Sequence, residues 1–526
     1  MICRSADQDG VKWRGRVLVT GATGFIGHYL LAELLKRGVP CAALLRPPLS
    51  TNVARLASLL RPLGISIQEE TTRWRLAFLE GELNGAMPGE SGLDIRSILH
   101  AAGVTTFEPM PNGEPKRTNV NGTAGLLAWA EAHEVTDFHL VSSAYRCGET
   151  NGPVLEKIDR DPPAFLNAYE ESKWESERLA CAWAERTGGR LTVYRPSIVV
   201  GDQRDGRTTS FSGFYVLARA NEVLSRWYGE SDAGRFATGL RISCSPEGRQ
   251  DLVPVDYVAT MIAHAVADPA FHGSVYHITH PKPPRNATIR RAIDEHFGFA
   301  GSSFIADQPI DETELSGAER VFYESTRVVR RYLSHHPVFD RTHAETLEAA
   351  SGARCGSLDV SSLRRLIGYA QSVQWGRCRA PRERVEDDRD ILIDRYFADY
   401  LPRHVVRSRV AQLTAMTTTM RFVISDVPGA PWVCGFDCGK LVRVRRTAEP
   451  DTVDFTYTTT RKVFWQAIAG EVSPQDVFLQ DMATVTGDVE AGIKMAVILH
   501  RFNHEFPCTP EDLRVTQEAA PCCASR

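Results

Sequence analysis

The chain has 526 residues, which is too long for one ordinary domain, so we expect two or three. Its hydrophobic content of 43% and charged content of 24% are typical of a soluble globular protein, and its net charge of −4 argues against a nucleic-acid partner. No apolar run reaches the length of a membrane span, and the 12 cysteines have neither disulfide nor metal-ligand spacing. With no visible signal peptide, these features predict a reduced, cytoplasmic protein without a metal site.

Strands alternate with helices over the first part of the chain, after a polar leader at residues 1–15. The expected strands are Arg16–Thr20, Cys41–Leu45, Ile95–Leu99, Phe138–Val141 and Leu191–Tyr194. The expected helices are Phe25–Lys36, Asn119–His133 and Tyr169–Glu185. This alternation predicts an α/β fold with a doubly wound parallel sheet that is covered on both faces.

The pattern loosens after Pro196. From there to about Pro284, loops, helices and short strands predict a small substrate lobe on the same domain. Residues 310–375 are expected to be a helical extension, so that residues 16–375 form one domain. The charged run over residues 376–390 is interpreted as a linker.

A different pattern follows the linker, and it predicts a separate α+β domain over residues 391–510 and a tail over residues 511–526. Consecutive antiparallel strands are expected at Thr418–Ser425, Trp432–Asp437, Lys440–Arg445 and Val453–Tyr457. A further strand, Asp481–Thr486, and two helices, Val463–Ala469 and Asp488–Arg501, complete this domain.

A glycine-rich turn joins the first strand to the first helix, with the spacing Gly21-x-x-Gly24-x-x-Gly27. The glycines allow a tight turn and let backbone N–H groups approach a pyrophosphate, and the N-terminus of the helix adds a favourable dipole. A glycine-rich turn that binds nothing is the alternative. The strand before the turn and the helix after it favour a dinucleotide site.

The end of the second strand bears on the choice of dinucleotide. A site specific for NAD usually has an acid there, about twenty residues after the glycines. Here the strand ends in Leu45-Arg46. Arg46 can hold a 2′-phosphate through charge-assisted hydrogen bonds, which favours NADPH over NADH. A solvated loop cation is the alternative interpretation of Arg46.

Tyr169 and Lys173 lie four residues apart on one expected helix, so their side chains share a face. A nearby ammonium group favours the phenolate, which predicts a lowered pKa for Tyr169 and a role in proton transfer. Ser143 follows a strand end and can hold the oxygen on which charge develops in hydride transfer. Asn119 can order a water or the lysine. Tyr145 has no lysine partner in sequence and is expected to line the pocket.

Together these residues resemble the extended short-chain dehydrogenase/reductase family over roughly residues 16–285, which implies a Rossmann domain. Supporting segments are Asn119–Thr123, Tyr194–Pro196, Gly201-Asp202 and Asp251–Ala259. The run Ser172–Leu179, taken with Asp251–Ala259, is similar to the thioester reductase and fatty acyl-CoA reductase branch. That branch uses NADPH to reduce an acyl thioester on coenzyme A or a carrier protein.

Carried over by position, the resemblance implies that Ser143, Tyr169 and Lys173 are catalytic and that Asn119 supports them. It implies cofactor contacts from Gly21, Thr23, Gly24, Phe25, Ile26, Gly27, Arg46, Glu82, Leu83, Ala101, Ala102, Gly103, Tyr169, Lys173, Pro196 and Ile198. Glu82 stands where the family usually has Asp near the adenine; it is longer but keeps the charge.

The C-terminal domain resembles the sterol carrier protein fold, on the segments Trp432–Val444, Asp454–Gly470 and Thr486-Gly487-Asp488. The resemblance implies an apolar tunnel for acyl chains or sterols, and therefore a lipid-like ligand. A domain used only for dimerisation or packing is the alternative.

These features predict an NADPH-dependent oxidoreductase that reduces a long-chain acyl thioester to the aldehyde and then the alcohol. One alternative is an NAD(P)-dependent alcohol or ketone dehydrogenase acting on a sterol-like or polyketide substrate. Another is a lipid-binding or transfer protein in which the Rossmann domain is a scaffold. Peripheral contact with a membrane near the substrate entrance is left open.

Overall fold

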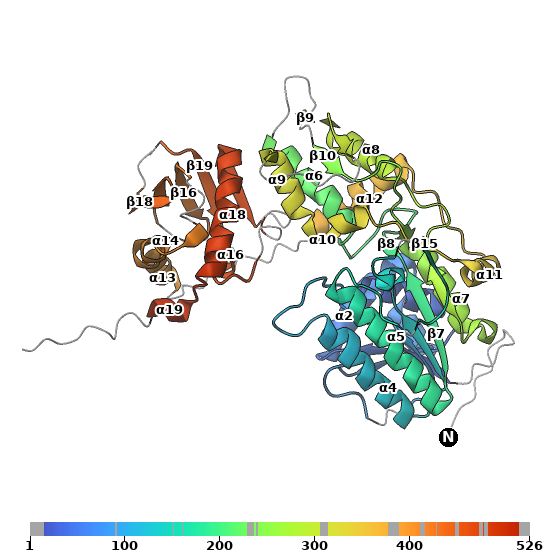
Figure 1. Cartoon of the computed structure of the whole chain (residues 1–526). Coiled ribbons are helices and arrows are strands. Elements are labelled where there is room, and N and C mark those ends of the chain that lie inside the picture. Colours follow the sequence, from blue (N-terminus) through green and yellow to red (C-terminus); the bar gives the residue numbers. More distant parts are fainter. Residues whose placement is uncertain are drawn as a thin grey trace, which may run out of the picture. The chain divides into compact units, whose positions relative to one another are not determined.

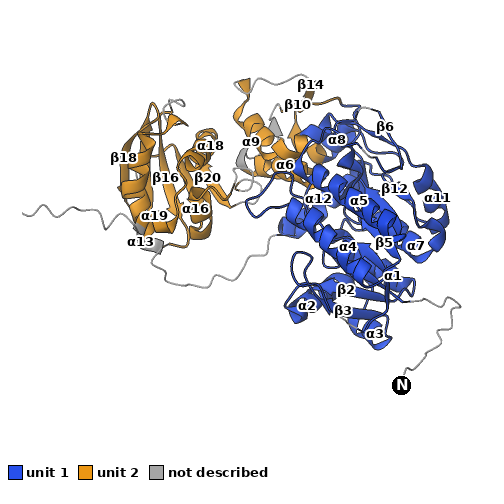
Figure 2. Ribbon diagram, turned by 60° about the horizontal axis from the view of Figure 1, so that its bottom comes forward, with its two compact units in different colours: residues 1–214, 246–292, 331–376 blue, residues 215–245, 293–330, 377–526 orange. Residues whose placement is uncertain are grey.

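The computed structural model describes residues 15–89, 92–150, 152–159, 161–228, 236–237, 240–305, 314–376, 389–410, 416–427, 429–447, 452–472, 477 and 482–514. The chain divides into two compact units (Figures 1 and 2). The first comprises residues 1–214, 246–292 and 331–376, and the second comprises residues 215–245, 293–330 and 377–526. Most of the expected leader, linker and tail lies outside the described residues.

A seven-stranded sheet forms the centre of the first unit, and each neighbouring pair of strands is parallel. Its strands are β1 (Arg16–Thr20), β2 (Cys41–Leu45), β3 (Leu76–Glu80), β4 (Ile95–His100), β5 (Asp137–Val141), β7 (Arg190–Pro196) and β12 (Val275–Ile278). Their order is β12-β7-β5-β4-β1-β2-β3, which confirms the predicted doubly wound topology. The direction of winding reverses between β1 and β4, where such sheets bind their ligands.

Helices cover both faces of this sheet because its buried strands carry apolar side chains on both sides. Val17 and Val19 of β1 pack with α1 (Phe25–Lys36) and α7 (Val255–Ala267), while Leu18 between them packs with α4 (Gly122–Ala132) and α5 (Ala168–Thr187). The other helices of this unit are α2 (Leu49–Leu60), α3 (Ile67–Thr72), α11 (Thr342–Ser351) and α12 (Val360–Ser372).

Two short parallel pairs of strands lie beside the main sheet of the first unit. They are β8 (Ile198–Val200) with β11 (Leu252–Pro254), and β6 (Pro153–Val154) with β15 (Val338–Phe339). The pair of β6 and β15 ties residues near the sheet to the segment that begins at residue 331.

The second unit contains a five-stranded mixed sheet in the order β18-β17-β16-β19-β20. Its strands are β16 (Thr418–Ile424), β17 (Trp432–Asp437), β18 (Lys440–Arg446), β19 (Phe455–Thr459) and β20 (Ala483–Gly487). The helices of this region are α13 (Arg389–Arg395), α14 (Leu401–Val405), α16 (Arg461–Ile468), α18 (Val489–Glu505) and α19 (Pro510–Arg514). The predicted α+β class is confirmed.

The expectation of consecutive antiparallel strands is wrong at one point, since β19 pairs with β16 in parallel. Strand β18 is largely exposed, so a strand added beside it would bury little apolar surface. By returning beside β16, the chain places Phe455 and Tyr457 in the core of the domain.

The remaining elements of the second unit precede this sheet in the chain. They are α6 (Phe214–Tyr228), β9 (Phe236–Ala237), β10 (Arg241–Ser243), β13 (Phe299–Ala300), β14 (Ser303–Ile305), α9 (Gly317–Ser325) and α10 (Arg327–Arg330), while α8 (Asn286–Phe297) spans the boundary between the units. Strands β10 and β14 pair in parallel, as do β9 and β13. Among the described residues, no helix has the length and hydropathy needed to cross a membrane.

Replacing Gly492 on α18 by alanine is expected to destabilise the second unit. A Cβ atom there would lie 2.3 Å from Cγ1 of Val485, and such overpacking costs about 1–3 kcal/mol. This exceeds the gain of about 1 kcal/mol in helix propensity. Calorimetry of the full chain should show one unfolding transition lowered by several degrees. Lys494→Ala, on the exposed side of α18, is the control, and equal transitions in the two variants would contradict the packing argument.

Candidate active site

The glycine-rich turn lies at the reversal point of the sheet, directly against the segment that follows β4. Gly21 has a φ of +69°, and a Cβ atom there would lie 2.6 Å from the Ala102 nitrogen. A Cβ atom on Gly27 would lie 2.0 Å from the Gly21 oxygen. Gly24 occupies the N-cap of α1 without a capping side chain, which leaves the first amides of the helix for an anionic ligand. This cradle fits a dinucleotide pyrophosphate.

Gly103 is the point where the cradle and the predicted catalytic residues meet. A Cβ atom on Gly103 would lie 3.1 Å from Nζ of Lys173 and 3.3 Å from Oδ1 of Asn119. The neighbouring Ala102 donates its N–H to Oγ1 of Thr20, at 3.3 Å. The segment after β4 is therefore held against β1 on one side and exposes its glycine to the lysine on the other.

The other predicted cofactor residues are spread along the same edge of the sheet. Arg46 is exposed directly after β2, and its carbonyl accepts a hydrogen bond of 2.8 Å from Asn52 Nδ2. Glu82 is also exposed, whereas Leu83 is half-buried. Thr23, Phe25 and Ile26 are half-buried in the turn and at the start of α1, Ala101 follows β4, Pro196 ends β7, and Ile198 begins β8.

Asn119 lies inside a π-helical turn, Arg117–Asn121, rather than at the start of the helix as predicted. Its Oδ1 accepts from the Val104 N–H at 2.8 Å, and its Nδ2 donates to the Val104 oxygen at 2.9 Å and to Ser172 Oγ at 2.8 Å. The side chain thus ties the segment after β4 to α5. It holds the helix that bears Tyr169 and Lys173 at a set distance from the sheet.

The predicted pair of Ser143 and Tyr169 is brought together, since a hydrogen bond from Ser143 acts on the Tyr169 phenol. Ser143 is the N-cap of a short 3₁₀ helix, Ala144–Cys147, and also accepts from the Tyr145 N–H at 3.3 Å. Burial nevertheless raises the pKa of Tyr169 to about 12, and the nearby Glu170 carboxylate adds to this effect. The prediction that Tyr169 has a lowered pKa is therefore wrong, because desolvation outweighs the stabilisation of the phenolate. At neutral pH Tyr169 is a proton donor.

Lys173 is buried and donates from Nζ to the Val141 oxygen at 3.1 Å, at the end of β5. Burial lowers the pKa of this amine to about 8, and the Glu177 carboxylate opposes the shift. The ammonium form is thus the main species at neutral pH. Its hydrogen bond to β5 holds the positive charge at the carboxyl end of the sheet.

A buried ion cluster on α5 supports this arrangement and was not predicted. Glu177 pairs with Arg195 at 2.7 Å and with Arg146 at 3.3 Å, and all three side chains are at most 2% exposed. Breaking such a cluster by removing one partner costs about 3–5 kcal/mol. The spacing of four residues between Lys173 and Glu177 is the sequence signal that places both on one helix face.

A second unpredicted group is a buried polar chain under the cradle. Oγ1 of Thr20 bonds Nδ1 of His100 at 2.7 Å, and Nε2 of His100 bonds Oγ1 of Thr123 at 3.0 Å. Burial, followed by the charge of Lys173, lowers the pKa of His100 to about 3, so the imidazole is neutral. The chain joins β1, β4 and α4 beneath the dinucleotide cradle.

Tyr332 closes the other side of the catalytic helix. Its hydroxyl donates to Oε1 of Glu170 at 2.5 Å and accepts from Nδ2 of Asn167 at 2.6 Å. Burial raises the pKa of Glu170 to about 7. Tyr145 is buried and packs edge-on against Tyr332, with ring centroids 5.1 Å apart. No sequence signal connects Tyr332 with Glu170, which lies 162 residues earlier.

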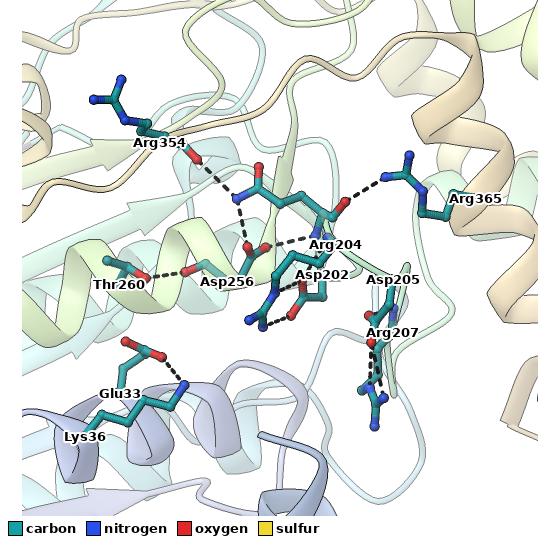
Figure 3. Close-up of polar contacts among 11 residues, drawn as sticks. Glu33, Lys36, Asp202, Arg204, Asp205, Arg207, Asp256, Thr260, Arg354 and Arg365 are labelled. Atoms are coloured by element: carbon teal, nitrogen blue, oxygen red, sulfur yellow. Dashed lines mark hydrogen bonds and ion pairs between the residues drawn. The ribbon is translucent and has the colours of Figure 1, made fainter. Parts of the chain in front are cut away.

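The Gly201-Asp202 motif leads into a brace rather than toward the catalytic residues (Figure 3). Gln203 receives and gives hydrogen bonds on three sides: to Asp256 of α7, to the Arg354 oxygen, and from Arg365 of α12. Asp202 pairs with Arg204 at 2.5 Å. These contacts attach α12 to the domain. Among the described residues, no cluster of His, Cys, Asp and Glu is arranged to hold a metal ion.

Comparison with protein families matches both parts of the chain. Residues 19–262 match the family described as "Male sterility protein", a family of NAD-binding domains, and residues 399–500 match the "SCP-2 sterol transfer family". The chain therefore combines a domain of the male sterility protein family with a domain of the SCP-2 family.

Two curated fungal proteins are similar to this chain. The non-canonical nonribosomal peptide synthetase FrzA of a Cladobotryum species is 29% identical over 292 residues, which are 51% of this chain and 26% of FrzA. The aldehyde reductase lnaA of Aspergillus flavus is 28% identical over 419 residues, 70% of this chain and 37% of lnaA. The chain thus spans well under half the length of these relatives.

Two solved structures share the fold. The terminal R domain from the myxalamid PKS-NRPS biosynthetic pathway has a TM-score of 0.56 and 22% identity, covering 71% of this chain and 94% of that domain. A thiolation-reductase di-domain from an archaeal non-ribosomal peptide synthetase has a TM-score of 0.52 and 17% identity, covering 69% of this chain and 76% of its own.

The lowered pKa of Lys173 predicts that its replacement by methionine changes stability in a pH-dependent way. Between about pH 8 and pH 10.5 the unfolded state binds more protons than the folded state, so the stability of the natural chain rises with pH. Lys173→Met should therefore be the more stable at pH 7, by roughly 1–3 kcal/mol, with the difference shrinking above pH 8. Denaturant unfolding across this range measures it. Lys494→Met, an exposed site, should show no such trend, and a pH-independent difference for Lys173→Met would contradict the shift.

Proposed function

We propose that the protein reduces an acyl thioester, carried on coenzyme A or a carrier protein, to the aldehyde and then to the alcohol, with NADPH as reductant. The observation that carries this proposal is the meeting of three groups at one sheet edge. The hydrogen-bonded Ser143 and Tyr169, the buried Lys173 and the rim of the glycine cradle at Gly103 lie together there. A carbonyl held beside Tyr169 would lie next to a dinucleotide bound in the cradle.

NADPH supplies the hydride for this reaction when it is bound. Ser143 donates a hydrogen bond to the thioester carbonyl oxygen and stabilises the negative charge that grows on it. Tyr169 gives its phenolic proton to that oxygen, forming a hemithioacetal. The hemithioacetal then loses its hydroxyl proton and breaks the C–S bond, which leaves an aldehyde and a free thiol. Lys173 holds its positive charge close to the cradle, where it binds the ribose hydroxyls.

The raised pKa of Tyr169 suits reduction better than oxidation. An alkoxide is a stronger base than a phenolate, so a phenol with a pKa of about 12 still protonates it. Oxidation of an alcohol at neutral pH would instead need the phenolate, which is the disfavoured form of this side chain. The hydrogen bond from Ser143 opposes the effect of burial and keeps the proton transferable.

Two relatives support an oxidoreductase of this kind. The relative from Aspergillus flavus is named an aldehyde reductase and matches 70% of this chain. FrzA is a peptide synthetase by name, and such enzymes carry their intermediates as thioesters on carrier domains, which supports a carrier-bound substrate. We propose residues 16–375 as the reductase domain, residues 391–510 as the lipid-binding domain, and the cytoplasm as the site of action.

The name of the relative lnaA also favours a second candidate, an aldehyde or ketone reductase that meets no thioester. The same serine, tyrosine and lysine serve that reaction. The two candidates differ in one product, because only thioester reduction releases a free thiol.

Tyr169→Phe tests the chemistry directly. Incubation of the full chain with NADPH and a pool of acyl-CoA and acyl-carrier thioesters should oxidise NADPH, release thiol and yield aldehyde or alcohol by mass spectrometry. Loss of the phenolic proton should lower kcat by about 10²–10⁴-fold. Tyr369→Phe, on α12, is the matched control and should keep full activity. A folded, cofactor-bound protein that consumes no NADPH with any thioester would sink the proposal.

Arg46→Ala tests the choice of cofactor. The guanidinium lies exposed after a strand that ends without an acid, where a 2′-phosphate would sit. Removing a charge-assisted contact of about 1.5–3 kcal/mol should raise KM for NADPH roughly 10–100-fold. KM for NADH should change less than about threefold, because NADH has no phosphate there. Equal effects on both cofactors would show that Arg46 does not read the phosphate.

A further inference from the structure

The second unit contains an apolar cavity of about 780 Å³ within its SCP-2 domain. Its walls come from the inner face of the five-stranded sheet and from α16 and α18, and they are mainly aromatic and aliphatic. Phe397, Phe422 and Phe464 pack together on one side, with ring centroids 5.2–5.9 Å apart. A volume of this size is typical of a site for one small ligand, and these walls suit an alkyl chain or a sterol.

The polar groups of the cavity wall include two side chains on α18, His500 and Asn503. They are three residues apart, so they share one face of the helix. The Tyr396 hydroxyl donates to Oδ1 of Asn503 at 3.5 Å, which turns the amide nitrogen of Asn503 to other partners. The imidazole of His500 donates to the Val472 carbonyl.

Burial lowers the pKa of His500 to about 4, and the adjacent His504 adds to this effect. His500 is therefore neutral at physiological pH. Because one ring nitrogen donates to Val472, the other is an acceptor. The helix thus offers a donor at Asn503 and an acceptor at His500.

None of the described residues that line the cavity is a lysine, an arginine, an aspartate or a glutamate. A carboxylate buried there would lose its hydration without gaining a counter-ion, which is strongly unfavourable. The phosphates of coenzyme A would meet the same penalty. A hydroxyl or aldehyde oxygen needs only hydrogen bonds, which the two side chains of α18 can supply.

We propose that this cavity binds a long-chain molecule with an uncharged oxygen at its head, held by Asn503 and His500, and that it thereby selects the alcohol over the corresponding acid. The assignment of this ligand as the reaction product rests on the proposed thioester reduction. An alcohol donates to His500 and accepts from Asn503, whereas an aldehyde can only accept. The cavity should therefore prefer the alcohol to the aldehyde as well.

Ligand binding to the full chain tests this proposal with 1-dodecanol, dodecanal and dodecanoate as probes, measured by calorimetry at neutral pH. Dodecanol should bind about tenfold more tightly than dodecanoate, a difference equivalent to 1.4 kcal/mol. Dodecanal should lie between them. Equal or tighter binding of dodecanoate, or no binding of dodecanol, would overturn the proposal without any variant being needed.

Two variants then locate the head group. Asn503→Leu should weaken dodecanol binding about fivefold to tenfold while changing dodecanoate binding less than twofold. His500→Lys supplies the missing cation and should reverse the preference toward dodecanoate. Lys494→Gln, on the exposed side of α18, is the control. An unchanged preference in both folded variants would place the head group elsewhere and overturn the assignment.

The proposed reduction is assayed separately on the same preparations, through NADPH oxidation and thiol release. Selective dodecanol binding without thioester reduction would refute the proposed function but leave the selectivity of the cavity intact. Thioester reduction together with tight dodecanoate binding would do the reverse.

Discussion

The close approach of two backbone segments at the reversal point of the sheet is the constraint on which the first unit depends. Gly21 and the segment Ala101–Gly103 touch so closely that a single Cβ atom would separate them. This contact places the nucleotide cradle beside Gly103, and Gly103 in turn lies against Lys173 and Asn119. Binding and chemistry are thus adjacent because glycine removes the side chains that would keep them apart.

Buried polar groups then fix the catalytic helix at that edge, and each group acts through a specific partner. Asn119 ties α5 to the segment after β4, and Glu177 joins the same helix to Arg146 and Arg195. Unpaired, these groups would be costly to bury, so their pairing favours one position of the helix. The same burial raises the pKa of Tyr169 and leaves its proton available for donation.

Much of the first unit was predictable because its signals are local. β1, α1 and β2 have the predicted bounds, since short, wholly apolar strands flank a helix that glycines delimit. β3 and β12 were not predicted: β3 is a partly exposed edge strand, and β12 buries Tyr276 and His277 among apolar residues. In the second unit the strands were found, but the parallel pairing of β16 with β19 has no local signal.

The amino-acid sequence by itself determined the doubly wound class, the glycine cradle, and the order of Ser143, Tyr169 and Lys173, because each depends on spacings within one turn, strand end or helix. Only the tertiary structure decided the protonation of Tyr169, the hydrogen bond of Tyr332 to Glu170, and the uncharged wall of the cavity in the second unit. Those properties depend on desolvation and on contacts between segments far apart in the chain, which no local pattern records.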